Sequence, residues 1–420
     1  MNTPAPGLLH RLTADAVRPN HLPDVDWLLE YLAVGSPHGE PIMLSLGETW
    51  GDTPPQLLQA LRRAPADAHG YQISMYGLPR LRRVIKEYVA STQRLPDANT
   101  WEAAVSWTGT RSTMRDFALL TRPNPGSQAL AVAPAWDYAG FLEPLGLRMA
   151  YVDTQAAHGF LPTAETIRAR ASQVTDLGMV IVNAQHNPTG ASWSRDVVES
   201  LIDVALERGA PLLIDDAYYG FPAPDSHPVS AVELLLRRLN GAPSPVPWLA
   251  VRSLGKQFQC NGWAIGAVLA EPGFLDTLVN DIRPQHTFNS GGVAQWAMAE
   301  WLEDRAAVEG YLAARREALA VKQKVVADLV GGEDGDTPVV YGPAAPYLLY
   351  PFGKSAAAYG GALGYLQAAV REAGVVLSDA WPLARVAHVP ESGYVRMYLG
   401  PDLQVLKEAC ARLERAGLLG

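Results

Sequence analysis

Short apolar runs alternate with amphipathic segments between about residues 100 and 270. Continuously apolar runs are typical of strands buried on both faces, and their alternation with helices is typical of a largely parallel sheet. The sequence therefore predicts an α/β fold. The predicted strands are Ala103–Trp107, Gln128–Ala133, Met149–Val152, Met179–Asn183, Pro211–Asp215, Trp248–Arg252 and Ile265–Ala270, and the helices between them include Thr113–Leu120, Tyr138–Leu145 and Arg195–Arg208.

The pattern changes after about residue 300. An amphipathic stretch over Ala306–Leu329 predicts one long helix, and a small α/β unit follows it to the end of the chain. Stretches rich in proline or glycine at Gly241–Pro247 and Gly331–Pro338 predict surface loops. The change of pattern predicts a second domain.

The composition indicates a folded, soluble protein and argues against several classes of partner. Of the 420 residues, 48% are hydrophobic and 18% are charged, which excludes a disordered chain. The net charge is −9 and no basic run occurs, so we expect neither nucleic acid nor a membrane surface as a partner. No apolar stretch is long enough to span a membrane. Because the chain has only two cysteines, we expect no disulfide scaffold and a reducing, cytoplasmic location. Because the histidines are scattered, we expect no metal site.

Candidate chemistry follows the predicted strands, because ligands of parallel sheets bind at the carboxyl ends of the strands. Lys256 follows one strand in the sequence SLGKQFQ. A lysine in such weakly polar surroundings loses its proton readily and can form a Schiff base. Asp215 ends another strand three residues before Tyr218, and this pair can hold a cationic ring nitrogen and a ring hydroxyl. Taken singly, each signal has a plainer interpretation, as a solvated loop lysine and as a helix-capping aspartate.

Three further strand ends carry polar or aromatic side chains. Thr108–Thr113 (TGTRST) opens a predicted helix, where backbone N–H groups can bind an anion with Arg111 as an added donor. Asn183–Gly190 (NAQHNPTG) contains a turn sequence. Trp136 in APAWDY can stack on a planar cofactor, although most tryptophans lie in the core. None of these signals is specific by itself.

The order and spacing of these motifs are specific when they are taken together. The chain resembles the pyridoxal-phosphate enzymes of fold type I, the class I/II aminotransferase family, over about residues 40–400. The motifs that carry the resemblance are TGTRST, APAW, HNPTG, IDDAYYGF and SLGK. Leu44–Pro54 (LSLGETWGDTP) is similar to the family's entry segment. Tyr76–Ile85 (YGLPRLRRVI) is similar to its G-x-x-x-L-R helix start, and also to aminocyclopropane-carboxylate synthases. Tyr394–Gly400 (YVRMYLG) is similar to its carboxylate-binding segment.

The resemblance implies an architecture of two domains. The large domain, over residues 60–300, would contain a mostly parallel seven-stranded sheet. The smaller α/β domain would combine residues 1–59 with residues 301–420. Family members build the site across a dimer interface, so the resemblance also implies a homodimer.

The resemblance assigns most contacts of the cofactor, pyridoxal 5'-phosphate. Lys256 matches the lysine that forms the aldimine and moves the substrate proton by way of a quinonoid. Asp215 matches the carboxylate that pairs with the pyridine N–H. Asn187 and Tyr218 match the donors to the ring hydroxyl oxygen, and Trp136 matches the aromatic ring stacked on the cofactor. The matching phosphate positions hold Thr110, Arg111, Ser112 and Ser253.

Further positions are implied around this centre. Arg396 matches the arginine that binds the substrate α-carboxylate, and Gly47 lies with Trp136 and Asn187 on the substrate side. Tyr71 is expected to reach the cofactor of the partner subunit, although it lies six residues before the helix-start glycine where the family has five. His186, beside Asn187, is expected to support Asp215.

The chain departs from the family pattern at two places. Ala264 stands where the family has the phosphate-binding arginine of G-x-R-x-G, so one phosphate charge lacks its usual partner. We expect Arg111 to supply the missing cation. Pro343–Tyr347 (PAAPY) replaces the family's P-x-G-[AT]-[FY] in a loop that faces the substrate. The identity of the amino acid substrate therefore stays open.

Three functions can be weighed on these residues. The resemblance favours an aminotransferase that acts on an α-amino acid, in amino acid metabolism or biosynthesis. The alternative is elimination or replacement at Cβ or Cγ, by a carbon–sulfur lyase or a synthase that uses S-adenosylmethionine, because it needs the same cofactor residues. A non-catalytic binding role is disfavoured because Lys256, Asp215 and Asn187 are all present.

Overall fold

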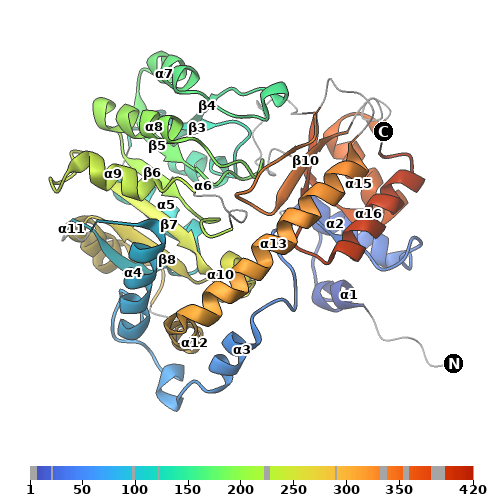
Figure 1. Ribbon diagram of the computed structural model, residues 1–420, viewed down its shortest axis with the longest axis horizontal. Helices are drawn as coiled ribbons and strands as arrows, with labels where there is room; N and C mark the ends of the chain where they lie inside the picture. Colours follow the sequence, from blue (N-terminus) through green and yellow to red (C-terminus); the bar gives the residue numbers. More distant parts are fainter. Residues whose placement is uncertain are drawn as a thin grey trace.

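A seven-stranded sheet forms the centre of the computed structural model, which describes residues 7–19, 22–96, 100–121, 123–221, 228–288, 291–331, 338–352, 359–379 and 393–419. The strand order is β2-β8-β7-β6-β5-β3-β4 (Figure 1). Strand β8 pairs antiparallel with β2 and β7, and the other neighbours pair parallel. The predicted α/β fold with a mostly parallel seven-stranded sheet is confirmed. The strands are β2 (Glu102–Val105), β3 (Gln128–Val132), β4 (Arg148–Val152), β5 (Leu177–Val182), β6 (Leu212–Asp215), β7 (Trp248–Ser253) and β8 (Gly266–Ala270).

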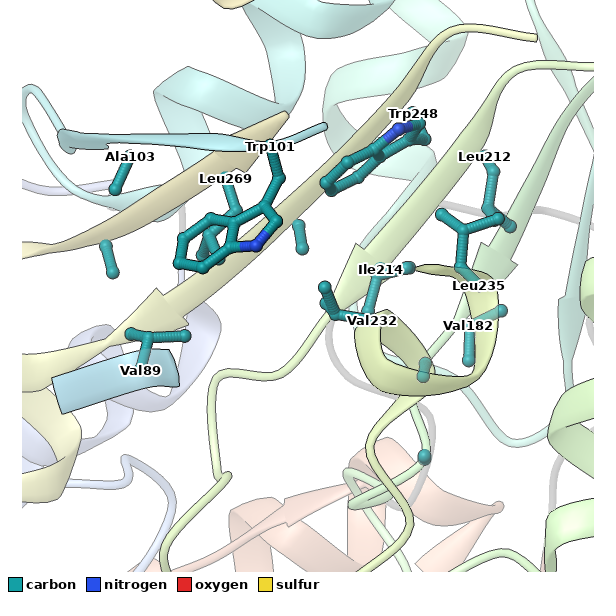
Figure 2. Packing of buried hydrophobic residues seen from close by; sticks show 14 of the residues in the cluster. Val89, Trp101, Ala103, Val182, Leu212, Ile214, Val232, Leu235, Trp248 and Leu269 are labelled. Atoms are coloured by element: carbon teal, nitrogen blue, oxygen red, sulfur yellow. The ribbon is translucent and has the colours of Figure 1, made fainter. Parts of the chain in front are cut away.

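Helices cover both faces of this sheet because successive strand side chains point to opposite faces. Leu212 and Ile214 of β6 belong to one core cluster, and Leu213 between them belongs to the other. Figure 2 shows the first cluster, where Trp248 and Leu269 of the sheet share the core with helical side chains. Its helices include α4 (Pro79–Gln93), α7 (Ala164–Gln173), α8 (Arg195–Arg208), α9 (Ala231–Leu239) and α12 (Gly292–Glu303), and those of the opposite face are α5 (Thr110–Thr121), α6 (Ala139–Leu142) and α11 (Pro272–Thr277).

Local signals explain where several helices begin and end. Helix α8 covers the predicted residues and ends at Arg208, and the φ of 65° at the following Gly209 suits a left-handed helix end. The predicted long helix is α13 (Arg305–Val330), and the Asp304 side chain caps it by accepting a hydrogen bond from the Ala307 N–H at 3.0 Å. Helix α13 runs from beside α12 to beside α16 (Leu403–Arg415), which in turn packs against α15 (Ala362–Ala373) (Figure 1).

A second, smaller sheet has the order β12-β13-β10-β9. A separate two-stranded parallel pair joins β1, near the N-terminus, to β11, so residues from both ends of the chain pack together. The division at residues 60 and 300 stays a prediction. Among the described residues, no helix is long and apolar enough to cross a membrane. The remaining elements are α1 (Leu8–Thr13), α2 (Pro23–Ala33), β1 (Ile42–Met43), α3 (Pro55–Arg62), α10 (Leu254–Gln257), β9 (Val340–Tyr341), β10 (Tyr347–Pro351), β11 (Val375–Val376), β12 (Ser378–Asp379) and β13 (Tyr394–Tyr398).

Candidate active site

Lys256 lies beside two of the predicted cofactor residues. It sits on the short helix α10, directly after β7, where the Ser253 hydroxyl accepts a hydrogen bond from its backbone N–H at 3.2 Å. The Lys256 Nζ is 4.7 Å from the ring centroid of Tyr218 and 5.8 Å from that of Trp136. These aromatic residues follow β6 and β3, so three strand ends bring their side chains to one place, as expected for a parallel sheet.

Asp215, the last residue of β6, is a buried carboxylate near this lysine. Its Oδ2 accepts a hydrogen bond from the Tyr138 hydroxyl at 2.8 Å, and its Oδ1 accepts one from the Ala217 N–H at 3.1 Å. Burial raises the pKa of Asp215, and the nearby Lys256 charge opposes that shift. A further cationic donor would therefore stabilise the charged carboxylate.

His186 does not provide the expected support for Asp215, so that expectation is wrong. Its Nδ1 lies 2.8 Å from the Thr189 Oγ1 within the same turn. Burial lowers the pKa of His186 to about 3, so the ring is neutral near pH 7. Tyr138 takes the place of His186. The sequence contained this tyrosine in APAWDY, but nothing in that run signalled a contact with a strand end 77 residues away.

Asp216, beside Asp215, lies in different surroundings. Its Oδ2 accepts a hydrogen bond from the Gln93 Nε2 at 2.7 Å, and its Oδ1 has no hydrogen-bond partner among the described residues. Burial raises the pKa of Asp216 to about 7. Of these two adjacent aspartates, Asp215 is the one whose raised pKa is opposed by the charge of Lys256.

The predicted carboxylate-binding arginine contacts another predicted residue. Arg396 of β13 is buried, and its Nη1 donates a hydrogen bond to the Asn187 Oδ1 at 2.9 Å. Its Nη2 donates to the Ser45 carbonyl at 2.7 Å, and its Nε to the Ser378 Oγ at 2.9 Å. The Asn183 Oδ1 accepts from the Asn187 N–H at 3.0 Å and holds that turn. The guanidinium is therefore fixed by three segments that lie far apart in the sequence.

Tyr347, for which the sequence predicts no role, lies in the middle of this arrangement. Its hydroxyl is 2.5 Å from the Tyr218 hydroxyl, and the Arg396 guanidinium carbon lies 4.6 Å from its ring centroid. A Cβ added at Gly47 would lie 2.5 Å from the Tyr347 hydroxyl, so only glycine fits there without a shift. PAAPY signalled a changed loop, but the family motif accepts tyrosine at this position and gave no reason to single it out.

The predicted phosphate residues surround the start of α5. Thr110 is the first residue of that helix, and the preceding Gly109 has a φ of 90° and donates its N–H to the Ala264 carbonyl at 3.0 Å. The Ser112 hydroxyl is hydrogen-bonded to the backbone of its own loop, including the Gly109 carbonyl at 2.9 Å. A cavity of about 120 Å³ lies against Ala264, where the family pattern has an arginine, and Ser106 is among the residues that line it.

Arg111 carries an ion pair that the sequence did not predict. Its Nη2 lies 2.5 Å from the Asp137 Oδ2, and its guanidinium carbon lies 5.0 Å from the Trp136 ring centroid. The side chain is 43% exposed. Its role toward the phosphate stays a prediction, and Asp137 would compete with the phosphate for the guanidinium.

Tyr71 does not join the site of its own chain. The residue is 82% exposed, and its ring contacts that of Phe288 with 5.5 Å between centroids. An approach to the site of a partner subunit stays a prediction. In the described parts of the chain, no group of three or more histidine, cysteine, aspartate or glutamate side chains could hold a metal ion.

Comparison with known proteins gives one consistent family. The family model "Aminotransferase class I and II" matches residues 40–413. A probable aspartate/prephenate aminotransferase of Thermus aquaticus is 27% identical over 278 residues, which is 66% of this chain and 68% of that protein. An arginine–pyruvate transaminase of Pseudomonas aeruginosa is 26% identical over 94% of this chain and 95% of its own length.

Solved structures share the fold. A double mutant of the aspartate aminotransferase of Thermus thermophilus has a TM-score of 0.77 at 23% identity, and the match covers 98% of this chain and 100% of that chain. The aspartate aminotransferase of Rhizobium meliloti also has a TM-score of 0.77, at 20% identity, over 99% of both chains. These similarities agree with the fold type predicted from the sequence.

Proposed function

Because the chain belongs to the class I and II aminotransferase family, whose members depend on pyridoxal phosphate, we propose that it transfers the amino group of an α-amino acid to a 2-oxo acid. One observation carries the proposal. Tyr218 lies against Lys256 Nζ, its hydroxyl meets that of Tyr347, and the Tyr347 ring lies against Arg396. A proton-transferring lysine and a carboxylate-binding arginine therefore face the same small region of the site.

Pyridoxal phosphate fits the chemistry of these residues. Asp215 is buried with a raised pKa, and a protonated ring nitrogen is the kind of cationic donor that stabilises such a carboxylate. At the other end, the start of α5 and the Ser253 hydroxyl offer donors for a phosphate. The alanine at position 264 makes this phosphate site less cationic than the family pattern.

Bound pyridoxal phosphate supplies an electron-withdrawing ring and the carbon that carries the amino group between the two substrates. Lys256 would hold that carbon through Nζ and would be the base for the proton of the substrate Cα. Asp215 would pair with the protonated ring nitrogen. Asn187 and Tyr218 hold the ring oxygen, and Arg396 binds the substrate carboxylate and so orients the Cα–H bond.

The amino donor is not assigned to one amino acid. The relatives above are named for aspartate and prephenate in one case and for arginine and pyruvate in the other, so their substrates differ in side-chain charge. Each acts on an amino acid or a 2-oxo acid, and we propose that this shared chemistry applies here. Elimination or replacement is not favoured, because these relatives are named as aminotransferases or transaminases.

The proposed function is tested by following the visible absorption of the enzyme loaded with pyridoxal phosphate. Adding single amino acids without an acceptor should convert the cofactor stoichiometrically to its pyridoxamine form, and a 2-oxo acid should restore the original spectrum. The amino acid that converts it identifies the donor. Continued release of ammonia and a 2-oxo acid without that conversion would instead support elimination and contradict amino transfer.

We further propose a homodimer formed through the face that carries Tyr71, Ile73 and Phe288. These apolar side chains are 82%, 99% and 57% exposed in the single chain. Apolar side chains gathered on one face are typical of an interaction surface. The dimer would bring Tyr71 to the partner's cofactor, as the family resemblance implies.

Ile73→Asp is expected to weaken this dimer by about tenfold or more and to lower activity with it, since a charge would be buried in the interface. Analytical ultracentrifugation over a range of concentrations measures the change. Val321→Asp, at a 55% exposed position on α13, is the matched control and should leave the dimer unchanged. An unchanged association constant for Ile73→Asp would place the interface elsewhere.

The proposed location is the cytoplasm. Both cysteines, Cys260 and Cys410, are buried and free. Free cysteines are typical of proteins from reducing compartments. The net charge of −9 gives no electrostatic reason for association with an anionic membrane.

A further inference from the structure

We propose that Tyr347 is a positioning residue that donates a hydrogen bond to the Tyr218 hydroxyl and so sets how strongly Tyr218 binds the ring oxygen of the cofactor. The inference rests on the proposed function, because it requires pyridoxal phosphate beside Tyr218. Tyr347 would act through Tyr218 and not by touching the reacting atoms.

The two hydroxyl groups are held together by both sheets of the molecule. Tyr347 is the first residue of β10 in the smaller sheet, and Tyr218 follows β6 of the larger sheet. Their oxygens are 2.5 Å apart, and their rings meet edge to face with 5.5 Å between centroids. Each residue is 2% exposed. Water therefore has little access to replace this hydrogen bond.

The direction of the bond follows from counting hydrogens. A phenol has one hydrogen to donate. If Tyr218 donates its hydrogen to the ring oxygen, it can only accept from Tyr347, and Tyr347 must be the donor. Burial raises the pKa of both phenols far above 10, so both are neutral near pH 7.

A donated hydrogen bond makes Tyr218 a better donor in its turn, because linked hydrogen bonds polarise one another. A stronger donor takes up more of the negative charge on the ring oxygen. The ring oxygen then stabilises less strongly the proton on the neighbouring nitrogen, which links Lys256 to the cofactor. That nitrogen therefore loses its proton at a lower pH. Without the Tyr347 hydroxyl, this deprotonation should move to a higher pH.

The ring of Tyr347 makes a second contact that can be tested separately. The Arg396 guanidinium carbon lies 4.6 Å from the ring centroid, within the range of a cation–π contact. The ring thus supports the residue proposed to bind the substrate carboxylate, while the hydroxyl supports Tyr218. Phenylalanine at this position keeps the ring contact with Arg396 and removes the hydrogen bond to Tyr218.

The test is a pH titration of the visible absorption of the holoenzyme without substrate. Tyr347→Phe is expected to raise the pKa of this spectral transition by about half a unit to one unit, as the loss of one hydrogen bond to a polarised donor implies. The KM for the amino acid should stay within about twofold, because the ring is retained. Tyr347→Leu should raise both the spectral pKa and the KM, the latter by about two- to fivefold.

Tyr398→Phe is the matched control. Tyr398 is as buried as Tyr347, and their ring centroids are 5.9 Å apart, but its hydroxyl bonds with Thr49 and Gln259. Its loss should leave the spectral pKa unchanged. An equal shift in this control would mean that any nearby hydroxyl has the effect and would overturn the proposal.

Tyr218→Phe makes the test specific to the proposed path. This variant should raise the spectral pKa by more than Tyr347→Phe, and adding Tyr347→Phe to it should cause no further shift. An unshifted pKa in Tyr347→Phe with cofactor still bound, or an additive shift in the double variant, would overturn the inference. The titration contains no substrate, so failure of amino transfer alone would count against the proposed function and not against this role of Tyr347.

Discussion

Lys256→Ala is expected to lower the rate of amino transfer by about four orders of magnitude or more, because it removes both the covalent attachment of the cofactor and the group that takes the Cα proton. The rate should be measured in a single turnover, with the cofactor loaded and one amino acid in excess. Lys256 is held by local contacts at a strand end and makes no ion pair within 4.0 Å among the described residues. The variant should therefore fold, and its thermal unfolding should remain cooperative.

Lys322→Ala is the matched control for this lysine. Lys322 lies on α13, where burial lowers its pKa and its Nζ donates a hydrogen bond to the Gly400 carbonyl at 2.7 Å. It thus shares partial burial with Lys256 but contacts none of the proposed cofactor residues in the described structure. Lys322→Ala should lower the rate of amino transfer far less than Lys256→Ala does. The two rate losses should differ by several orders of magnitude. Near-normal single turnovers in Lys256→Ala would contradict the assigned base.

Asp215→Asn is expected to lower kcat by about 10²- to 10³-fold, because a neutral amide cannot balance a protonated ring nitrogen in a buried site. The shape of the side chain is kept, so the fold should persist. The readouts are kcat with a saturating donor and the affinity for pyridoxal phosphate measured by fluorescence quenching. An asparagine variant with the kcat of the wild type would remove Asp215 from the proposed mechanism.

Asp216→Asn provides the control for position and burial. Since burial raises the pKa of Asp216 to about 7, this side chain is mainly protonated at pH 6, and asparagine resembles that neutral form. At pH 6, kcat should therefore change by no more than about threefold.

In the wild type, the folded state holds the Asp216 proton more tightly than the unfolded state, so the free energy of unfolding falls as pH rises from about 4 to about 7. Asp216→Asn should remove that loss, and its gain in Tm over the wild type should be larger at pH 8 than at pH 5.

The sheet could be predicted from the sequence because its signals are local. The strands of the large sheet are short and mainly apolar, and helix α8 is followed by a glycine, so the predicted range of that helix agrees with the observed one. The placement of Lys256 and Asp215 at one edge follows from the same signals, since parallel strands end together. Their roles came from the family resemblance and not from this periodicity.

The contacts between side chains could not be predicted in the same way. Tyr218 and Tyr347 are 129 residues apart, and their contact depends on how the two sheets are packed. The prediction for His186 was wrong for a local reason. His186 is next to Asn187 in the sequence and was expected to reach Asp215, but the turn directs the His186 ring to Thr189. The direction of a side chain in a turn and the packing of one sheet against another leave no periodic pattern in the sequence.

The guanidinium of Arg396 is held by the Ser45 carbonyl, 351 residues earlier in the chain. At the edge of the large sheet, β2 likewise pairs with β8, which is made some 160 residues later. During synthesis, a nascent chain can therefore complete the large sheet and present Lys256 and Asp215 before residue 396 leaves the ribosome. Such a chain would have groups for the cofactor before it could hold an amino acid by its carboxylate. The residues expected to contact the cofactor, from Tyr71 to Lys256, thus precede the arginine expected to bind the substrate in the order of synthesis.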